Sequence, residues 1–370
     1  MLDLAVLVWC TRTFYILSSA IILAVRLIPD LKTRFLSYGA RDSGGTTTAA
    51  AVAAVHNHNH NHNHNATGSR LLQQKQRQEQ QSSSPLSSQL LDHVTSWKVP
   101  HSWFIHFYIL SVLLSTTCIW TTLQSTNHHF NSNSNTNFSF TATTTATPTT
   151  SLLCSLLMLL QGLRRLLECL YVTNNTNTKT DTKPSASRMW IGHYAIGLAF
   201  YLFTNLAIHL EYLAAVHSPN KHLGNSSPSS TRELPLPLPL PLVRALFTPK
   251  TIICTSLFLH CSYKQNKYHR YLAGLKKYTL PDKGAFQTII APHYTAECGI
   301  YLSLTLLQAP DQHGHGHGQG YINWSLTCAL LFVMVNLGVT ADGTREWMMT
   351  KFPKQRKEVA ARWRMIPPFW

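Results

Sequence analysis

The chain has 370 residues, with 31 Lys and Arg against 15 Asp and Glu and a formal net charge of +16. Its mean hydropathy of −0.05 would suit a soluble protein, but that average combines very apolar stretches with very polar repeats. The positive charge does not indicate a nucleic-acid-binding protein, because the basic residues are grouped in alternate connections between the apolar stretches. This distribution is typical of a membrane protein.

Seven apolar stretches approach the roughly 20 residues that an α-helix needs to cross the hydrocarbon core of a bilayer. They run from Leu4 to Ile28, Trp103 to Leu123, Ser151 to Val172, Ile191 to Val216, Leu242 to Tyr263, Ile289 to Gln308 and Ile322 to Thr340. The fifth is the least regular, because Arg244, Pro249 and Lys250 shorten its apolar part, so six to eight spans fit the sequence. We predict an all-α integral membrane protein with about seven transmembrane helices.

The distribution of Lys and Arg predicts the orientation of these spans. Basic residues follow the first, third, fifth and last stretches, whereas the connections 124–150 and 309–321 contain no Lys or Arg. Cytosolic connections carry the excess of positive charge, so we expect the N-terminus outside and the C-terminus in the cytosol. The first stretch contains Arg12 and Arg26 and lacks a clear small-residue cleavage site, which favours a membrane anchor over a signal peptide.

Polar low-complexity segments interrupt the connections and spare the apolar stretches. They include alternating His and Asn at 56–65 and a Gln-rich and Ser-rich run at 73–89. Such compositions cannot bury a core, which predicts disordered loop insertions. The repeated histidines imply no defined ligand geometry, so simple repeat expansion is favoured over a metal site. The eight cysteines lie mostly within the spans and form no disulfide or zinc framework.

These insertions divide the chain into three parts. Residues 1–42 hold the first span and its flank, 43–96 form one long low-complexity insertion, and 97–370 form the membrane core. Further insertions are predicted near 125–150, 173–188, 217–241 and 309–320. Because the insertions spare the spans, we expect the membrane core to carry the function.

Two ionisable residues lie inside the sixth apolar stretch. His293 and Glu297 are four residues apart, so on a helix they and Tyr301 project from one face. An ionisable group within a membrane is costly unless it faces a cavity, a partner or a ligand. The two groups therefore either bind a ligand or satisfy each other across one helical turn and join helices.

The third stretch carries a second polar stripe. Spacings of four and three residues place Gln161, Arg165 and Glu168 on one side of a helix, next to Arg164. In one interpretation Arg165 bridges Glu168 and holds the bundle together, since a buried arginine needs a carboxylate partner. In the other, Arg164 or Arg165 contacts a cofactor phosphate, and Gln161 or Glu168 binds or polarises a substrate.

The second stretch opens with aromatic residues and with His106 about one turn inside. A neutral imidazole can donate a hydrogen bond to a developing oxyanion, and a cationic one can protonate it. Trp103 and Tyr108 either contact a substrate or form an aromatic belt at the membrane interface.

The connection after the fifth stretch, from Gln265 to Tyr278, is basic with interleaved aromatics. It suits phosphates and an adenine, or else it anchors the chain to anionic headgroups. The sequence contains no Gly-x-Gly-x-x-Gly turn, so a soluble Rossmann domain is not supported.

Six separate segments carry a family pattern. They are Val-Pro-x-x-Trp-Phe-x-His-Phe-Tyr at 99–108, Gln-x-x-Arg-Arg-x-x-Glu-Cys at 161–169, Gln-x-x-x-His-x-x-Leu-Ala at 265–273, Tyr-Thr-Leu-Pro at 278–281, Pro-His-Tyr-x-Ala-Glu at 292–297 and Asn-Leu-Gly-Val-Thr-Ala at 336–341. In this order they resemble the steroid 5-alpha-reductase family, in particular its polyprenol reductase branch. The chain departs from the family at 358–365, which separate a basic run from the apolar terminus. It also lacks the Gln-Glu-x-Pro motif of the steroid-reducing branch, near the position of His106.

The resemblance implies reduction of the carbon-carbon double bond nearest the oxygen of a long polyisoprenoid, with hydride from NADPH. A hydride adds readily to an alkene only if a conjugated carbonyl accepts the charge, so polyprenal is a more plausible reactant than polyprenol. The product, dolichol, would support lipid-linked oligosaccharide synthesis and protein N-glycosylation at the endoplasmic reticulum membrane. The substrate tail partitions into the bilayer, which predicts lateral entry between helices.

The resemblance also implies roles for the polar residues. The catalytic candidates are His106, Tyr294 and Glu168, as donors to the enolate oxygen or as groups that orient a donor. The substrate contacts are Trp103, Tyr108 and Gln161. The cofactor contacts are Arg164, Arg165, Gln265, His269, Arg270, Lys276, Tyr278, His293, Glu297 and Asn336. Of these, His293 and Glu297 are expected at the nicotinamide or ribose end.

Two alternatives stay open. The chain could reduce a steroid enone or an enoyl thioester, because these substrates share the conjugated-carbonyl chemistry. It could also be a transporter or scaffold without enzymatic activity, whose charges form a path or structural pairs. A transporter built from inverted repeats would show matching broken segments in two halves, and the sequence shows no such internal match.

Overall fold

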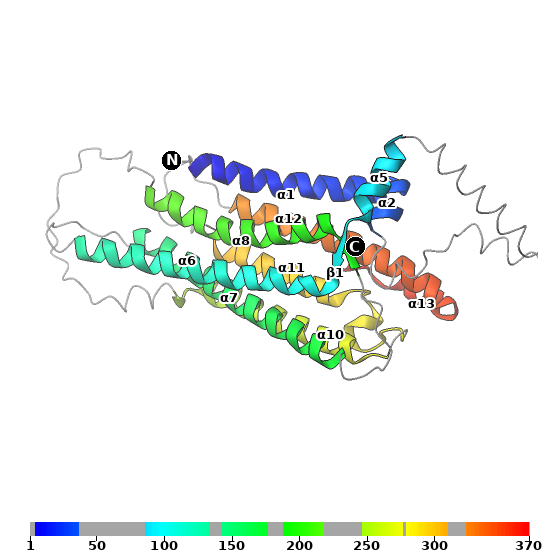
Figure 1. Ribbon diagram of the computed structural model, residues 1–370. Helices are drawn as coiled ribbons and strands as arrows, with labels where there is room; N and C mark the ends of the chain where they lie inside the picture. Colours follow the sequence, from blue (N-terminus) through cyan, green and yellow to red (C-terminus); the bar gives the residue numbers. More distant parts are fainter. Residues whose placement is uncertain are drawn as a thin grey trace, which may run out of the picture.

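The computed structural model describes residues 4–36, 86–132, 143–176, 188–217, 246–276, 279–309 and 323–369. Within these ranges, seven long helices run alongside one another as a bundle (Figure 1). They are α1 (Leu4–Leu27), α6 (Phe104–Ser132), α7 (Thr143–Thr176), α8 (Ile191–His217), α10 (Pro249–Gly274), α11 (Pro292–Leu307) and α12 (Trp324–Lys351). Each overlaps one of the predicted apolar stretches, so the all-α prediction is confirmed. Helix α10 begins later than the fifth stretch and continues through Gly274, so most of the basic segment predicted as a connection after that stretch is helical.

Some of the helices have the length and composition of membrane spans. In the described part of the chain, four segments meet both criteria: Leu4–Leu27, His101–Gln124, Ile191–Leu210 and Trp324–Lys351. The other long helices fall short for physical reasons: α7 carries Arg164, Arg165 and Glu168, and α11 has only 16 residues. The chain is thus a multi-pass membrane protein, while the number of seven spans stays a prediction.

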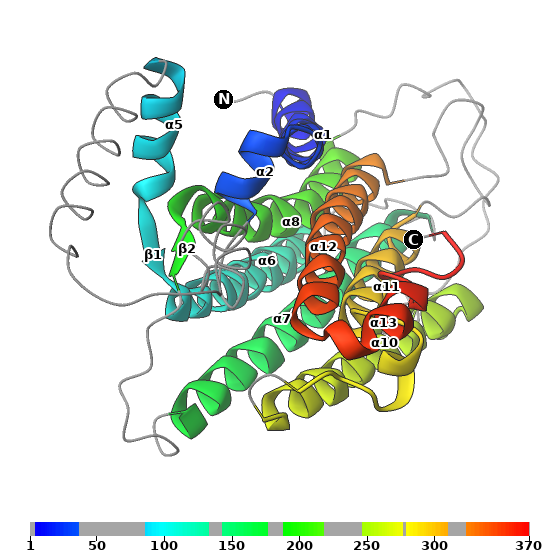
Figure 2. The same ribbon diagram turned by 90° about the vertical axis from the view of Figure 1, so that its right-hand side faces the viewer.

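The helices pack around a core of aromatic and aliphatic side chains contributed by six of them. In the end-on view, α12 lies inside the bundle, with α1 and α8 on one side and α11 on the other (Figure 2). Phe14 of α1 stacks on Phe203 of α8 with ring centroids 4.6 Å apart, and Phe200 stacks on Phe332 of α12 at 5.4 Å. This packing holds α1 against the rest of the bundle.

Small residues let neighbouring helices approach closely, as is common in membrane bundles. A Cβ atom on Gly162 of α7 would lie 3.2 Å from Ser111 Oγ of α6. A Cβ atom on Gly197 of α8 would lie 2.5 Å from the Phe107 ring of α6. These two contacts set the spacing of α6 against α7 and α8.

One end of the bundle carries short helices and a small two-stranded sheet. Strand β1 (Lys98–Pro100) pairs antiparallel with β2 (Arg188–Trp190), with Val99 opposite Met189. Helices α2 (Pro29–Phe35) and α5 (Leu86–Ser96) lie at the same end (Figure 1). The strand pairing joins the starts of α6 and α8, because each strand directly precedes one of these helices; the 3-10 turn η2 (His101–Trp103) leads into α6.

The prediction of a disordered insertion over 43–96 is wrong at its C-terminal end, where residues 86–96 form α5. Two contacts explain why this part is ordered: Trp190 Nε1 donates to the Val94 carbonyl at 2.9 Å, and Arg34 pairs with Asp92. Helices α6 and α7 likewise extend into the insertion predicted near 125–150. The remainder of that insertion, residues 43–85 and most of the other predicted insertions lie outside the described residues.

The residues beyond α12 return to the start of α11. After the 3-10 turn η5 (Pro353–Gln355) and α13 (Arg356–Ala361), residues 362–365 form what we call the C-terminal strap. Its Trp363 pairs in parallel with Ile289, which follows the 3-10 turn η4 (Gly284–Gln287). The segment that departs from the family pattern, 358–365, therefore packs against the chain just before α11.

We expect Gly197→Ala to destabilise the protein by about 1–3 kcal/mol, because overpacking a filled site forces neighbouring atoms to move. Phe107 cannot easily yield, since it is 5 % exposed and stacked between Tyr194 and Tyr201. Thermal unfolding of the purified protein in detergent measures the effect. Gly274→Ala is the matched control, because nothing lies within 4 Å of a Cβ there. Phe107→Leu should partly rescue Gly197→Ala, and equal unfolding midpoints for both alanine variants would refute the packing argument.

Candidate active site

A cluster of polar side chains joins α7, α10 and α11 and includes one tyrosine of α6. We call it the polar cluster, and its members are Tyr108, Gln161, Arg164, Arg165, Glu168, Gln265, Asn266, His269 and Glu297. The α7 members recur at three- and four-residue spacings, as do those of α10, so each helix turns one polar stripe toward the other. The predicted stripe on the third apolar stretch is thereby brought together with predicted residues from the sixth stretch and from the basic segment that follows the fifth.

Glu168 is the most heavily bonded acceptor of the polar cluster. Its carboxylate accepts hydrogen bonds from Nη1 of Arg164 and Nη1 of Arg165, and from Asn266 Nδ2 at 2.6 Å. His269 Nδ1 lies 2.9 Å from the same carboxylate, whose side chain is only 12 % exposed. The predicted bridge from Arg165 to Glu168 is therefore present, and Arg164 adds a second one.

His269 lies between a donor and an acceptor. Its Nδ1 is 2.6 Å from Arg165 Nη1 and 2.9 Å from Glu168 Oε2. Arginine can only donate and an ionised carboxylate can only accept, so the two contacts require different tautomers of the imidazole. If Nδ1 of His269 carries a proton, it donates to Glu168; if it does not, it accepts from Arg165.

A second chain of hydrogen bonds links the three helices through amide groups. Gln161 Nε2 donates to Gln265 Oε1 at 3.1 Å, and Gln265 Nε2 donates to Glu297 Oε2. Arg164 Nη2 donates to Gln161 Oε1 at 2.9 Å and also to Gln265 Oε1. Gln161 and Gln265 are buried, so these amides carry the bonds between α7 and α11 across α10.

Glu297 is thus held by Gln265, so of the two interpretations of His293 and Glu297, the one in which they satisfy each other is not what the geometry shows. In the described part of the chain, the buried polar atoms without a protein partner include His293 Nδ1, Arg164 Nε and the Tyr301 hydroxyl, together with Thr255 Oγ1 on α10 and Gln308 Oε1 at the end of α11. Leaving such atoms unpaired costs free energy. Their presence fits a polar ligand, and they meet a requirement of a nicotinamide cofactor for hydrogen-bonding groups beside its amide and ribose.

Aromatic rings lie around the first turn of α11. The His293 ring lies 4.2 Å from the Tyr294 ring and 5.5 Å from the His269 ring, measured between centroids. Phe286 lies 6.3 Å from His293. Tyr294 is half-buried and packs against the main core, so the structure brings it next to the predicted cofactor residues.

His106 lies apart from the polar cluster. Its Nδ1 is 2.9 Å from the Tyr194 hydroxyl of α8, and Trp103 packs against both rings. Tyr108 instead accepts hydrogen bonds from Arg165 at 2.7 and 3.2 Å. Two residues along a helix rotate by about 200°, which explains why α6 turns His106 toward α8 and Tyr108 toward α7. Within the described residues, no hydrogen bond or ring contact joins His106 to Glu168.

Three residues that bond to predicted site residues were not predicted from the sequence. Tyr194 was not proposed as a site residue, although the aromatic opening of the fourth stretch, Trp190 to Tyr194, resembles that of the second. Asn266 and Ser262, which donates to Gln161 at 3.3 Å, were also missed, because polar residues at the end of a basic helix carry no distinctive pattern.

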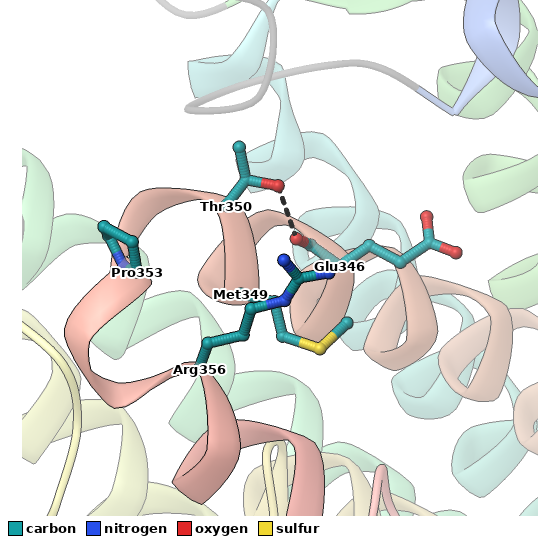
Figure 3. Close-up of a pocket in the computed structure, with 5 residues that line it drawn as sticks. All are labelled: Glu346, Met349, Thr350, Pro353 and Arg356. Atoms are coloured by element: carbon teal, nitrogen blue, oxygen red, sulfur yellow. Dashed lines mark hydrogen bonds between the residues drawn. The ribbon is translucent and has the colours of Figure 1, made fainter.

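The remaining predicted residues lie outside the polar cluster. Arg270 and Lys276 are exposed at the end of α10 and just after it, and Asn336 is half-buried on α12. Tyr278 lies outside the described residues. A cavity of about 460 Å³ opens at the end of α12, lined by Glu346, Met349, Thr350, Pro353 and Arg356 (Figure 3). None of its lining residues belongs to the polar cluster.

Residues 242–370 match the family of 3-oxo-5-alpha-steroid 4-dehydrogenases. This region includes α10, α11, α12 and the C-terminal strap, and it contains four of the six segments that carry the resemblance. The segments at 99–108 and 161–169 lie outside it, so the family match covers one side of the polar cluster.

Curated relatives extend the similarity over more of the chain. A polyprenal reductase of Caenorhabditis elegans is 26% identical over 278 residues, which cover 70% of this chain and 77% of the relative. The human polyprenal reductase is 25% identical over 71% of this chain and 77% of its own length. That of Saccharomyces cerevisiae is 25% identical over 59% of this chain and 60% of its own. These findings confirm the resemblance drawn from the six segments: residues 242–370 match this reductase family, and the chain is similar to curated relatives named polyprenal reductase.

Proposed function

We propose that this protein reduces the carbon-carbon double bond nearest the aldehyde of polyprenal, with NADPH as the hydride donor, on the route to dolichol. The observation that carries this proposal is the similarity to polyprenal reductases over about 70% of the chain. The polar cluster supports it, because most of its members are residues that the resemblance assigns to the reaction. The endoplasmic reticulum membrane, a cytosolic C-terminus and support of N-glycosylation belong to the same proposal.

The reaction needs an acceptor for negative charge. Hydride addition beside a conjugated aldehyde moves charge onto the carbonyl oxygen, and an enzyme accelerates this step with donors placed at that oxygen. A polyisoprenoid tail stays in the bilayer, so only its polar head has to reach the donors between the helices. We assign donation to His106, supported by Tyr194, or to Tyr294.

We assign Glu168 an orienting role. Its carboxylate already accepts from Arg164, Arg165 and Asn266 and lies against His269. A carboxylate held by that many donors is strongly favoured in its ionised form and is a poor source of protons. Glu168 therefore holds Arg165, which in turn bonds the Tyr108 hydroxyl, a substrate-contact candidate.

NADPH, when bound, supplies the hydride. The two arginines of the polar cluster are already bonded to Glu168, so the cluster suits the uncharged nicotinamide end better than the phosphates. His293 and Glu297 are assigned to that end, since His293 Nδ1 has no partner among the described residues. The phosphates and adenine are assigned to exposed basic groups such as Arg270 and Lys276 at the end of the α10 segment and to Tyr278. Gln265, His269, Arg164, Arg165 and Asn336 remain cofactor candidates in this proposal.

A second candidate substrate is a steroid enone, because the family matched by residues 242–370 is described by that activity. A steroid enone offers the same conjugated carbonyl, without the long flexible tail. The two substrates share the chemistry of the site, so only turnover separates them.

We expect membranes containing this protein to oxidise NADPH with polyprenal and to form a product two daltons heavier. Polyprenol and a steroid enone, supplied separately, should remain unreduced. Product mass spectrometry, with NADH run in parallel, measures this preference. Reduction of the steroid alone would transfer the protein to the second candidate function, and the absence of turnover by folded protein would refute both.

We expect His106→Phe to lower kcat by about 10²-fold or more, the usual contribution of a positioned acid-base group. Phenylalanine keeps the ring packing against Trp103 and removes the hydrogen bond to Tyr194. His101→Phe is the matched control, since His101 precedes α6 and packs against Phe104. Single-turnover kinetics give the comparison, and equal rates for the two variants would exclude His106 as a donor.

We expect Glu168→Ala to destabilise the fold by about 3–5 kcal/mol, because it leaves two buried arginines without their carboxylate. Asp92→Ala breaks the exposed pair with Arg34 and should cost about 1 kcal/mol or less. Folded yield and thermal unfolding in detergent distinguish the two variants. A Glu168→Ala protein as stable as Asp92→Ala would show that Glu168 does not hold the helices together.

A further inference from the structure

Asp342 of α12 holds two segments that are far apart in the sequence. Its Oδ2 accepts from Arg26 Nε of α1 at 2.8 Å, and its Oδ1 accepts from Arg364 Nε of the C-terminal strap at 2.7 Å. The Asp342 side chain is only 14% exposed. Each carboxylate oxygen thus accepts from a different arginine. The connection to α1 and the connection to the C-terminal strap can therefore be disrupted separately by changing Arg26 or Arg364.

Arg26 and Arg364 differ in whether another carboxylate can take the place of Asp342. Arg26 has a second carboxylate partner, Glu346, at 3.1 Å, and Glu346 also binds Lys32 at 2.7 Å. In the described part of the chain, the ion pair of Arg364 is with Asp342. Loss of the Asp342 charge therefore leaves α1 with its ion pair to Glu346 and removes the ion pair of Arg364. Arg362 of the strap keeps its pair with Glu358 and its hydrogen bond to the Pro281 carbonyl, so only the Arg364 end of the strap depends on Asp342.

The strap in turn holds the start of α11. Ile290 donates its N–H to the Trp363 carbonyl at 2.8 Å, and Ala291 donates to the Arg364 carbonyl at 3.2 Å. Thr295 Oγ1 donates to the Met365 carbonyl at 2.6 Å. These three bonds flank His293 and Tyr294 on both sides.

The start of α11 has no side-chain cap, and its local bonds are those of the Tyr294 and Thr295 N–H groups to the Ala291 carbonyl, at 2.9 and 3.4 Å. Its first residues have N–H groups without helical partners, which a capping side chain commonly satisfies. The cap residue here is Ala291, which has no side-chain hydrogen bond, and Pro292 follows it. The position of the first turn of α11 is thus fixed from outside the helix.

We propose that Asp342 is a positioning residue for the reductase reaction: by holding Arg364 it fixes the strap, and the strap fixes His293 and Tyr294 at the start of α11. This role rests on the proposed function, because it assigns those two residues to cofactor and substrate. In this role Asp342 of α12 contacts neither the cofactor nor the substrate and acts through the strap.

The test compares Asp342→Asn and Arg364→Gln with the control Glu346→Gln, one turn further along α12. Hydrogen exchange of the purified protein in detergent follows the amides of 288–291 and 363–365. Steady-state kinetics with polyprenal give kcat and the KM for NADPH. We expect both test variants to exchange faster at these amides and to raise the KM about five- to thirtyfold, with kcat less affected. The control should match the wild type in both measurements.

Two further variants separate positioning from general damage. The double variant Asp342→Asn with Arg364→Gln should be no worse than either single one, since paired residues are not additive. Arg364→Lys, which keeps the charge, should recover most of the wild-type KM. Unchanged exchange in Asp342→Asn, or faster exchange with unchanged kinetics, would overturn the proposal. If the wild type does not reduce polyprenal, the proposed function fails, whereas unchanged exchange still overturns the link from Asp342 to α11 by itself.

Discussion

The bundle depends on the placement of one carboxylate, Glu168, inside a segment that the rest of the sequence makes apolar. An ionised group away from water is tolerated only when donors replace its hydration. Arg164 and Arg165 lie on the same helix as Glu168, whereas Asn266 and His269 lie on α10. Satisfying the charge therefore requires α10 to lie against α7 in one register. The same requirement places Gln265 between Gln161 and Glu297 and so includes α11.

This constraint separates two kinds of polar contact in the molecule. The Glu168 carboxylate is occupied by its donors and has little capacity left for a ligand. His293 Nδ1, Arg164 Nε and the Tyr301 hydroxyl, in contrast, are buried and have no partner among the described residues. A rigid set of paired charges beside a small set of unpaired atoms is the arrangement expected where a site is held in place before its ligand binds.

The helices could be predicted from the sequence because hydropathy and length decide which segments can cross a bilayer. The members of the polar cluster could be recognised because charged residues inside apolar stretches are rare. Their partners could not be predicted, since these depend on how each helix is rotated. Close approaches such as Gly162 to Ser111 and Gly197 to Phe107 join different helices, and nothing local in the sequence encodes them. For the same reason the pairing of His106 with Tyr194, 88 residues apart, was missed. The order of residues 86–96 was also missed, because it depends on contacts with Trp190 and Arg34.

The C-terminal strap has a consequence for the order in which the protein matures during synthesis. His106, Glu168 and Tyr294 precede α12 in the chain, whereas the bonds that fix the start of α11 come from residues 362–365, which follow α12 and are synthesised after it. A nascent chain that stops before residue 362 contains all three catalytic candidates and lacks the partner of Ile290 and Ala291. The first turn of α11 can therefore be held in position only after α12 and residues 362–365 have been synthesised. A chain that ends before them contains the catalytic candidates without the contacts that position Tyr294.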